Sequence, residues 1–167
     1  SQLITVKDKY SAAIETALGA AVQNIVVDNE TDAKRAMGFL KEHRAGRATF
    51  LPITAIKGRV LSEQGLDDQY GFVSIASDLV SYDNKYSEII RWLLGRTAVA
   101  EDIDSAIAIA KKYSYRFRIV TLDGQVINAG GSMTGGSRVQ NAGILSRGNE
   151  IERLKGSLAS MQKELDG

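Results

Sequence analysis

The residues with the clearest chemical potential form a glycine-rich segment late in the sequence. Five glycines fall within thirteen positions, from Gly124 to Gly136. A Walker-type phosphate loop needs a lysine after its second glycine, whereas Gly135 is followed by Gly136 and Ser137. The dinucleotide pattern G-x-G-x-x-G is absent as well, because the glycine pairs are spaced differently. Two interpretations stay open: a flexible linker, or paired glycines that let another backbone approach closely because they lack a Cβ.

Few other residues offer catalytic or metal chemistry. The sequence has no cysteine and a single histidine, His43. Thiolate metal sites, cysteine nucleophiles and disulfides are therefore excluded, as are most zinc sites and any histidine-dependent relay within one chain. Helix capping explains the nearby acids Asp102 and Asp104, and Trp92 beside an apolar stripe is expected in the core. We predict no catalytic residue, no metal site and no cofactor.

The composition and the order of charges along the chain limit the class of protein. Hydrophobic residues make up 44% and charged residues 25%, a balance typical of soluble globular proteins. No apolar run reaches the roughly 20 residues of a membrane span, which predicts a cytoplasmic protein without a membrane partner. The opening apolar segment, residues 3–6, suggests a piece excised from a longer chain.

Charged residues are segregated along the sequence. Residues 34–59 carry seven Lys/Arg against Glu42, residues 60–104 are acidic, and residues 105–147 are basic again. Such blocks favour either a self-neutralising surface or a basic region that contacts phosphates.

The sequence also contains an internal repeat with an offset of 76 residues. Leu3-Ile4-Thr5-Val6 aligns with Leu79-Val80-Ser81-Tyr82, and Lys9-Tyr10 aligns with Lys85-Tyr86. The same register relates Leu18-Gly19 to Leu94-Gly95. A period this long indicates a duplicated subdomain of about half the chain.

Both halves read as mixed helix and strand, which predicts an α+β fold. Periodic apolar residues predict helices from Tyr10 to Ala21 and from Tyr86 to Leu93. A second helix in each half is expected near Thr31, capped at its end by Gly46, and after Asp102 or Asp104. The expected strands cover residues 23–27 (buried), 47–53 (with Pro52 arguing against a central place in a sheet), 97–100, 116–122 and 125–128. Asp123-Gly124 predicts a hairpin with a type I′ turn.

The C-terminal part has a different pattern. Ile151, Leu154, Leu158, Met161 and Leu165 are spaced three and four residues apart, like the seam of a coiled coil. A short amphipathic helix docked on the core is the alternative. We therefore divide the chain into subdomain I (1–64), a linker (65–71), subdomain II with the glycine-rich segment (72–148) and the start of a coiled-coil arm (149–167).

At this point several segments together resemble one family. The glycine segment resembles the signature of the hinge domains of SMC (structural maintenance of chromosomes) proteins, most of all bacterial chromosome-partition members. So do the segments 17–19, 23–27, 46–52 and 119–122. The resemblance covers residues 1 to about 148.

The resemblance implies a function and a set of site residues. Family hinges have two similar subdomains and form a ring-shaped homodimer that joins coiled-coil arms for chromosome condensation and partitioning. It implies that Gly130, Gly131, Gly135 and Gly136 lie at the dimer interface, where neighbouring edge strands pair. It also implies weak DNA binding, with single strands preferred, through Lys41 and Arg138. ATP binding is expected only in the head domains of a full-length protein.

The charge blocks add Arg44, Arg47 and Arg147 to the candidate DNA contacts. Arg138 is followed by Val139 and Gln140 where some family members carry a run of lysines, which argues against strong DNA binding. The alternative functions are a small-molecule-binding regulatory domain, or an enzyme with a site between the repeats. Both lack support from a nucleophile–base pair, a metal cluster or a phosphate loop.

The missing phosphate lysine leads to a prediction about nucleotides. The 167-residue chain is expected neither to bind nor to hydrolyse ATP. Titration calorimetry with millimolar nucleotide and magnesium should show no saturable heat. A specific micromolar site would show that the glycine segment has been misinterpreted.

Overall fold

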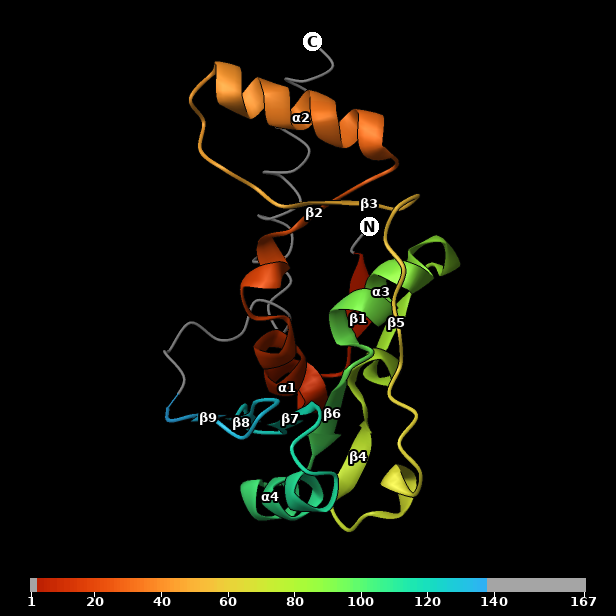
Figure 1. The fold of residues 1–167 in the computed structure, drawn as a ribbon, viewed down its shortest axis with the longest axis vertical. Helices are drawn as coiled ribbons and strands as arrows, with labels where there is room; N and C mark the ends of the chain where they lie inside the picture. The colour runs from red at the N-terminus through yellow and green to blue at the C-terminus, as the bar shows by residue number, and fades with distance from the viewer. Residues whose placement is uncertain (1–2, 138–167) are drawn as a thin grey trace.

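The structure is a computed structural model that describes residues 3–137 of the 167. It is a mixed α+β fold, as predicted. Its strands form one five-stranded sheet and two small two-stranded sheets within the described residues. Figure 1 shows an elongated molecule with helix α2 near one end and helix α4 at the other. No helix within residues 3–137 is long and apolar enough to cross a membrane.

The first repeat runs strand, helix, strand, helix, strand. Its elements are β1 (Ile4–Val6), α1 (Asp8–Leu18), the 3-10 turn η1 (Gly19–Gln23), β2 (Ile25–Val27), α2 (Glu30–Glu42) and β3 (Phe50–Pro52). β2 and β3 pair in parallel, with α2 as the crossover between them. The predicted strand at residues 23–27 is therefore present. It is half-buried, not buried as expected, because its two-stranded sheet has a helix packed on it and no further strands.

The second repeat has the same order of elements. It comprises β5 (Val80–Tyr82), η4 (Asn84–Tyr86), α3 (Ser87–Leu94), β6 (Thr97–Ala100), α4 (Ile103–Lys112) and β7 (Arg118–Thr121). β6 and β7 also pair in parallel around their crossover helix. Their sheet is larger because β4 (Phe72–Ile75) pairs antiparallel with β6, and β8 (Val126–Ile127) and β9 (Met133–Thr134) extend it beyond β7.

The two repeats meet at an antiparallel pair formed by their first strands. Thr5 of β1 lies opposite Ser81 of β5, its equivalent at the offset of 76, and the flanking pairs Ile4–Tyr82 and Val6–Val80 are related symmetrically about it. Equivalent side chains also make the same contact, because the ammonium groups of Lys9 and Lys85 lie 4.9 and 5.0 Å from the ring centres of Tyr10 and Tyr86. The repeat in the sequence is therefore a local pseudo-twofold in space.

The second helix of each repeat begins with the same kind of cap. The Asn29 side chain accepts a hydrogen bond from the Asp32 N–H, and Asp102 accepts one from the Ser105 N–H, both at 2.8 Å. The Ser105 N–H favours the charged carboxylate and holds the pKa of Asp102 below its usual value. Asp102, not Asp104, is thus the capping acid.

Two details of backbone geometry differ from the prediction. Gly46 does not cap α2, because Arg44 adopts the left-handed conformation (φ 51°) and the Ala45 N–H closes the helix on Leu40 O at 2.9 Å. The hairpin between β7 and β8 is present, but its turn is not type I′. Of its central residues only Gly124 has positive φ (85°), which is the geometry of a three-residue loop.

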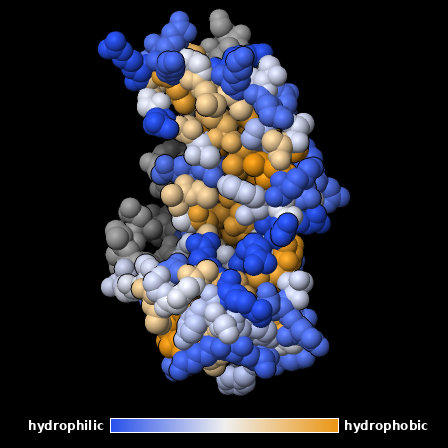
Figure 2. Space-filling view, in the orientation of Figure 1, coloured by the Kyte–Doolittle hydropathy of each residue, from blue (hydrophilic) through white to orange (hydrophobic). Residues whose placement is uncertain are grey.

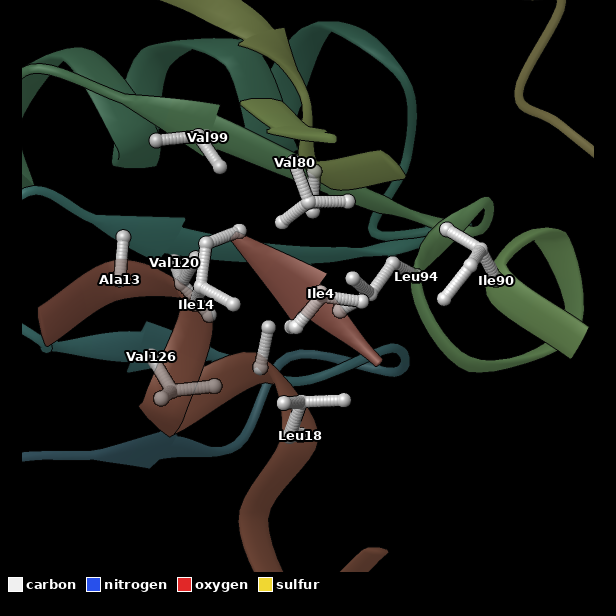
Figure 3. Packing of buried hydrophobic residues seen from close by; sticks show 12 residues of the cluster. Ile4, Ala13, Ile14, Leu18, Val80, Ile90, Leu94, Val99, Val120 and Val126 are labelled. Carbon is white, nitrogen blue, oxygen red and sulfur yellow. The ribbon is translucent and has the colours of Figure 1, made fainter. Parts of the chain in front are cut away.

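The main core lies between the repeats. Figure 3 shows side chains from both repeats in one cluster, among them Ile14 on α1, Leu94 on α3 and Val120 on β7. A second cluster lies beneath α4 and contains Ile109, Ile119 and Ile127. The boundary at residue 64 stays a prediction, since the first cluster joins residues from both sides of it.

The segment that connects the repeats is packed on this second cluster. Leu66, in the turn η2 (Leu66–Asp68), is 2% exposed and belongs to the cluster under α4. The Tyr113 hydroxyl donates to Gln64 O at 2.8 Å, and Arg116 pairs with Glu63 at 2.8 Å. Residues 61–69 are therefore held against α4, although their polar composition indicates only a linker.

β2, α2 and β3, which we call the α2 lobe (residues 25–52), have a separate small core. Its buried apolar side chains are Ala33, Ala36, Leu40 and Leu51, and none belongs to either large cluster. The apolar spacing of α2 predicts Met37 on one face with Ala33, Ala36 and Leu40, but Met37 is 58% exposed. The lobe depends on few internal contacts, so its stability should be lower than that of the body.

This division predicts different outcomes for two core substitutions. Ile14→Ala should lower the free energy of unfolding of the whole chain by about 2–5 kcal/mol, because it opens a cavity in the shared core. Leu51→Ala should loosen mainly the α2 lobe. Amide hydrogen exchange should then accelerate in residues 25–52 for Leu51→Ala and throughout residues 3–137 for Ile14→Ala. Uniform acceleration in both variants would contradict a separate lobe.

Candidate interface surfaces

The glycine-rich segment surrounds the edge strand of the five-stranded sheet. β9 pairs with β8 on one side, with Met133 opposite Ile127, and it is the last strand of the sheet. Both of its residues are exposed. Gly130 and Gly131 precede this strand, and Gly135 and Gly136 follow it (Figure 1). An exposed edge strand presents unpaired backbone N–H and C=O groups to other chains.

The backbone of this segment accounts for part of its glycine content. Gly130, Gly131 and Gly136 have φ values of 91°, 109° and 133°, which side chains rarely adopt. The Gly130 N–H donates to Tyr115 O at 2.8 Å, and the Gly131 N–H donates to Asn128 O at 2.9 Å. A Cβ at Gly130 or Gly136 would meet nothing within 4 Å in the same chain. Backbone conformation, not crowding within the chain, therefore favours glycine at these two positions.

Gly135 differs from the other three glycines. Its φ lies outside the left-handed region, and a Cβ there would overlap only the end of the Gln125 side chain. That amide also brackets the next residue: it accepts from the Gly136 N–H at 2.9 Å and donates to Gly136 O at 3.1 Å. The end of a glutamine side chain can move, so a side chain at Gly135 would be tolerated within the subunit. A substitution of Gly135 therefore tests the approach of a partner with the least backbone strain.

The candidate DNA contacts that the structure describes lie together at the C-terminal end of α2. Lys41 is in its last turn, and Arg44 and Arg47 follow it; all three side chains are exposed. His43 lies among them, with its ring stacked on Phe39 (centroids 4.2 Å apart) and Nδ1 3.0 Å from Phe39 O. Arg138 and Arg147, like the expected coiled-coil seam, fall outside the described residues.

Packed side chains occupy the space between the repeats. The first core fills it, as Figure 3 shows for Ile4, Ile14 and Leu94. Nor does any group of three His, Asp or Glu residues in the described part of the chain stand close enough to hold a metal. The geometry thus favours surface interactions over a small-molecule site between the repeats.

Sequence analysis missed the half-buried residue Arg118. Its guanidinium donates to Thr97 Oγ1 at 3.3 and 3.2 Å and to the Ala17 carbonyl. Burial lowers the pKa of Arg118 from its usual value. The last turn of α1 has no basic residue of its own, so Arg118 supplies a cation there from the other repeat. Only the tertiary fold brings these two segments together.

Trp92 is also not where the sequence predicted. It is 47% exposed on α3, not buried in the core, because Ile89, Ile90 and Leu94 form the buried side of that helix.

The chain that leaves the α2 lobe crosses α3 beside Trp92. The Gly58 N–H donates to Glu88 at 3.2 Å, and the Leu61 N–H donates to Gly95 O at 2.8 Å.

The comparisons with known proteins agree with this architecture. Residues 1–110 match the family described as "SMC proteins Flexible Hinge Domain". The chain is 43% identical to the chromosome partition protein Smc of Lactiplantibacillus plantarum and 41% identical to that of Bacillus subtilis, over 99% and 98% of its length. It spans only 14% of either relative.

Solved structures give the same result. The hinge domain of Geobacillus stearothermophilus SMC, described as an asymmetric dimer, is 48% identical with a TM-score of 0.82, covering 98% of this chain and 67% of that one. The Pyrococcus furiosus SMC hinge domain is 31% identical with a TM-score of 0.69, over 87% and 75% of the two chains. The duplicated strand–helix order, the glycine-flanked edge strand and these matches agree: the chain belongs to the SMC flexible hinge domain family.

Proposed function

We propose that this hinge homodimerises through β9 and joins the two coiled-coil arms of an SMC dimer. The observation that carries the proposal is the exposed edge strand, Met133–Thr134, flanked on both sides by paired glycines. The G. stearothermophilus relative is described as a dimer, which supports self-association. Backbone pairing at a sheet edge supplies directional hydrogen bonds without requiring bulky side chains.

The α2 lobe offers the complementary surface. In a closed dimer, a contact between different elements occurs twice, once in each direction. β2 and β3 form a sheet of only two strands, so each has an unpaired edge among the described residues. Figure 2 shows apolar residues exposed on the face below α2, where the lobe meets the body. We infer that β9 of each protomer extends the β2–β3 sheet of its partner and covers this surface.

Within a full-length SMC protein, the dimer would connect two arms that begin near residue 149. The chain would then contribute to chromosome condensation and partitioning at the nucleoid, in the cytoplasm. It would supply association, not catalysis, and ATP would bind at head domains elsewhere in that protein. The division into subdomains 1–64 and 72–148 belongs to this proposal.

Weak DNA binding completes the proposed function. Lys41, Arg44 and Arg47 form an exposed cationic group at the end of α2, and Arg138 and Arg147 would add to it. The ion pairs Arg91–Glu88 and Arg116–Glu63 of the described residues involve none of the first three. A few such contacts favour weak binding that falls as salt rises, with single strands preferred.

The dimer proposal predicts monomers when the β9 flank is blocked. Gly130→Glu combined with Gly135→Glu should dissociate the dimer and leave the fold intact. Overpacking costs about 1–3 kcal/mol per site and each substitution is felt twice by symmetry, so each one should raise the dissociation constant by roughly two to four decades, and the two together by more. Light scattering gives the molar mass, and circular dichroism reports the fold.

Gly65→Glu is the matched control. Gly65 has a positive φ (76°), like Gly130 (φ 91°), and a Cβ there would make only ordinary contacts, but it lies outside the α2 lobe, in the turn before η2. It should carry the same backbone strain and remain a dimer. If the Gly130/Gly135 variant dimerises with unchanged affinity, the glycine segment is only a linker. If the variant is unfolded, the glycines are needed for the fold of a single subunit.

The DNA proposal predicts a charge-specific loss. Replacing Lys41, Arg44 and Arg47 with Glu should weaken binding of single-stranded DNA and flatten the slope of log K against log salt by about 2, because about three phosphate contacts disappear. Lys111→Glu with Lys112→Glu, in the equivalent last turn of α4, is the control and should bind as the parent does. Equal losses in both variants, measured by fluorescence anisotropy, would indicate only a general charge effect.

A further inference from the structure

A second group of exposed cations lies on two segments that meet at Trp92. Lys57 and Arg59 flank Gly58 in the segment that leaves the α2 lobe, and Arg91 and Arg96 lie at and just beyond the end of α3. The five side chains of Trp92 and these four cations are all exposed. We call this group the Trp92 surface. It combines residues from the basic block 34–59 with two of the three bases of the acidic block 60–104.

Two glycines bring the separate segments into contact. A Cβ on Gly58 would overlap the backbone of Trp92 and the Cβ of Arg91, and a Cβ on Gly95 would overlap the carbonyl of Arg59. The crossing segment therefore lies directly on α3. Gly58 faces the helix, and the side chains of its two neighbours, Lys57 and Arg59, are exposed. The sequence alone does not predict this meeting of charges.

The charge of the surface is only partly neutralised. Glu88 lies 3.6 Å from Arg91 and also accepts the Gly58 N–H. This carboxylate is thus shared between one cation and the backbone of the crossing segment. An exposed ion pair of this kind contributes little and leaves the guanidinium accessible to a phosphate. The ion pairs Arg91–Glu88 and Arg116–Glu63 of the described residues include none of Lys57, Arg59 and Arg96.

We propose that the Trp92 surface binds single-stranded nucleic acid, with a base stacked on the indole and neighbouring phosphates on Lys57, Arg59, Arg91 and Arg96. An exposed aromatic ring among cations has the two components that strand binding without sequence preference requires. A duplex would hide its base faces, so it would use only the cations. This site would bind the same class of ligand, nucleic acid, as the proposed function, but it lies on α3 and not on α2.

The experiment uses the fact that Trp92 is the only tryptophan of the chain. An oligothymidylate of about eight nucleotides, within the usual size of such sites, should quench its fluorescence saturably, and the quenching should weaken as salt rises. An abasic oligomer of the same length should bind more weakly and leave the emission nearly unchanged. Equal quenching by polyglutamate would instead assign the surface to acidic proteins and overturn the proposal.

Variants separate stacking from general attraction. With a labelled oligothymidylate, Trp92→Ala should weaken binding by about 5- to 100-fold, the range expected for one stacked base, and Trp92→Phe should restore most of it. Arg59→Glu with Arg96→Glu should weaken binding without changing the dimer. Tyr70→Ala is the matched control, since Tyr70 is an aromatic side chain that is 88% exposed elsewhere.

The outcomes distinguish this inference from the proposed function. If the oligonucleotide binds but neither quenches Trp92 nor responds to Trp92→Ala, the α2 surface carries the binding and this proposal is wrong. If light scattering shows that Trp92→Ala lowers the molar mass, Trp92 belongs to the protomer interface, which also overturns it. If no nucleic acid binds at all, both DNA proposals fail and dimerisation is unaffected.

Discussion

Burial of apolar side chains between the two repeats is the interaction on which the rest of this hinge depends. Ile14 and Leu94 occupy equivalent faces of α1 and α3, and both pack in the cluster that contains Val120 of the large sheet. Neither helix covers enough apolar surface to be stable alone, because most helical stability in proteins comes from tertiary packing. The antiparallel pair β1–β5 fixes the two repeats about a local twofold. Arg118 adds a polar contact from β7 to the end of α1.

This shared core leaves two parts of the chain with unsatisfied surface. Within residues 3–137, the α2 lobe has a two-stranded sheet and a core of four small or medium side chains, and β9 ends the large sheet with an open edge. Both are weak points in an isolated subunit. In the proposed dimer they would be complementary, because an edge strand can extend a neighbouring sheet and cover its apolar face. The proposed dimer would thus follow from how the duplicated unit distributes its core.

The two repeats have diverged in structure. β6 and β7 continue into β8 and β9, whereas β2 and β3 have no further strands beside them in the described residues. The second helices have also diverged: α2 ends in a group of exposed cations, and α4 covers the second core with Ile109 and Ala110. One copy therefore offers a charged lobe and a short sheet, and the other offers the stable body and the edge strand.

The sequence by itself determined the features that depend on neighbouring residues. Apolar spacing predicted the helices of both repeats, Asp102 or Asp104 was predicted as a cap, and the offset of 76 residues predicted the duplication. These follow from local hydrogen bonding and helix geometry, which a short window contains. The family could be predicted too, because the glycine segment and the flanking strand segments occur together.

The tertiary structure decided everything that depends on which distant segments meet. Trp92 is exposed because three other residues of α3 face the core. After α2, the left-handed residue that turns the chain is Arg44, and Gly46 does not cap the helix. Two of these features join residues more than ten positions apart: the contact of Gly58 with α3 and the hydrogen bond from Arg118 to α1. The open edge of β9 depends on the absence of a neighbouring strand in the described residues. Periodicity carries no information about such contacts, since they depend on how the elements pack and not on their local pattern.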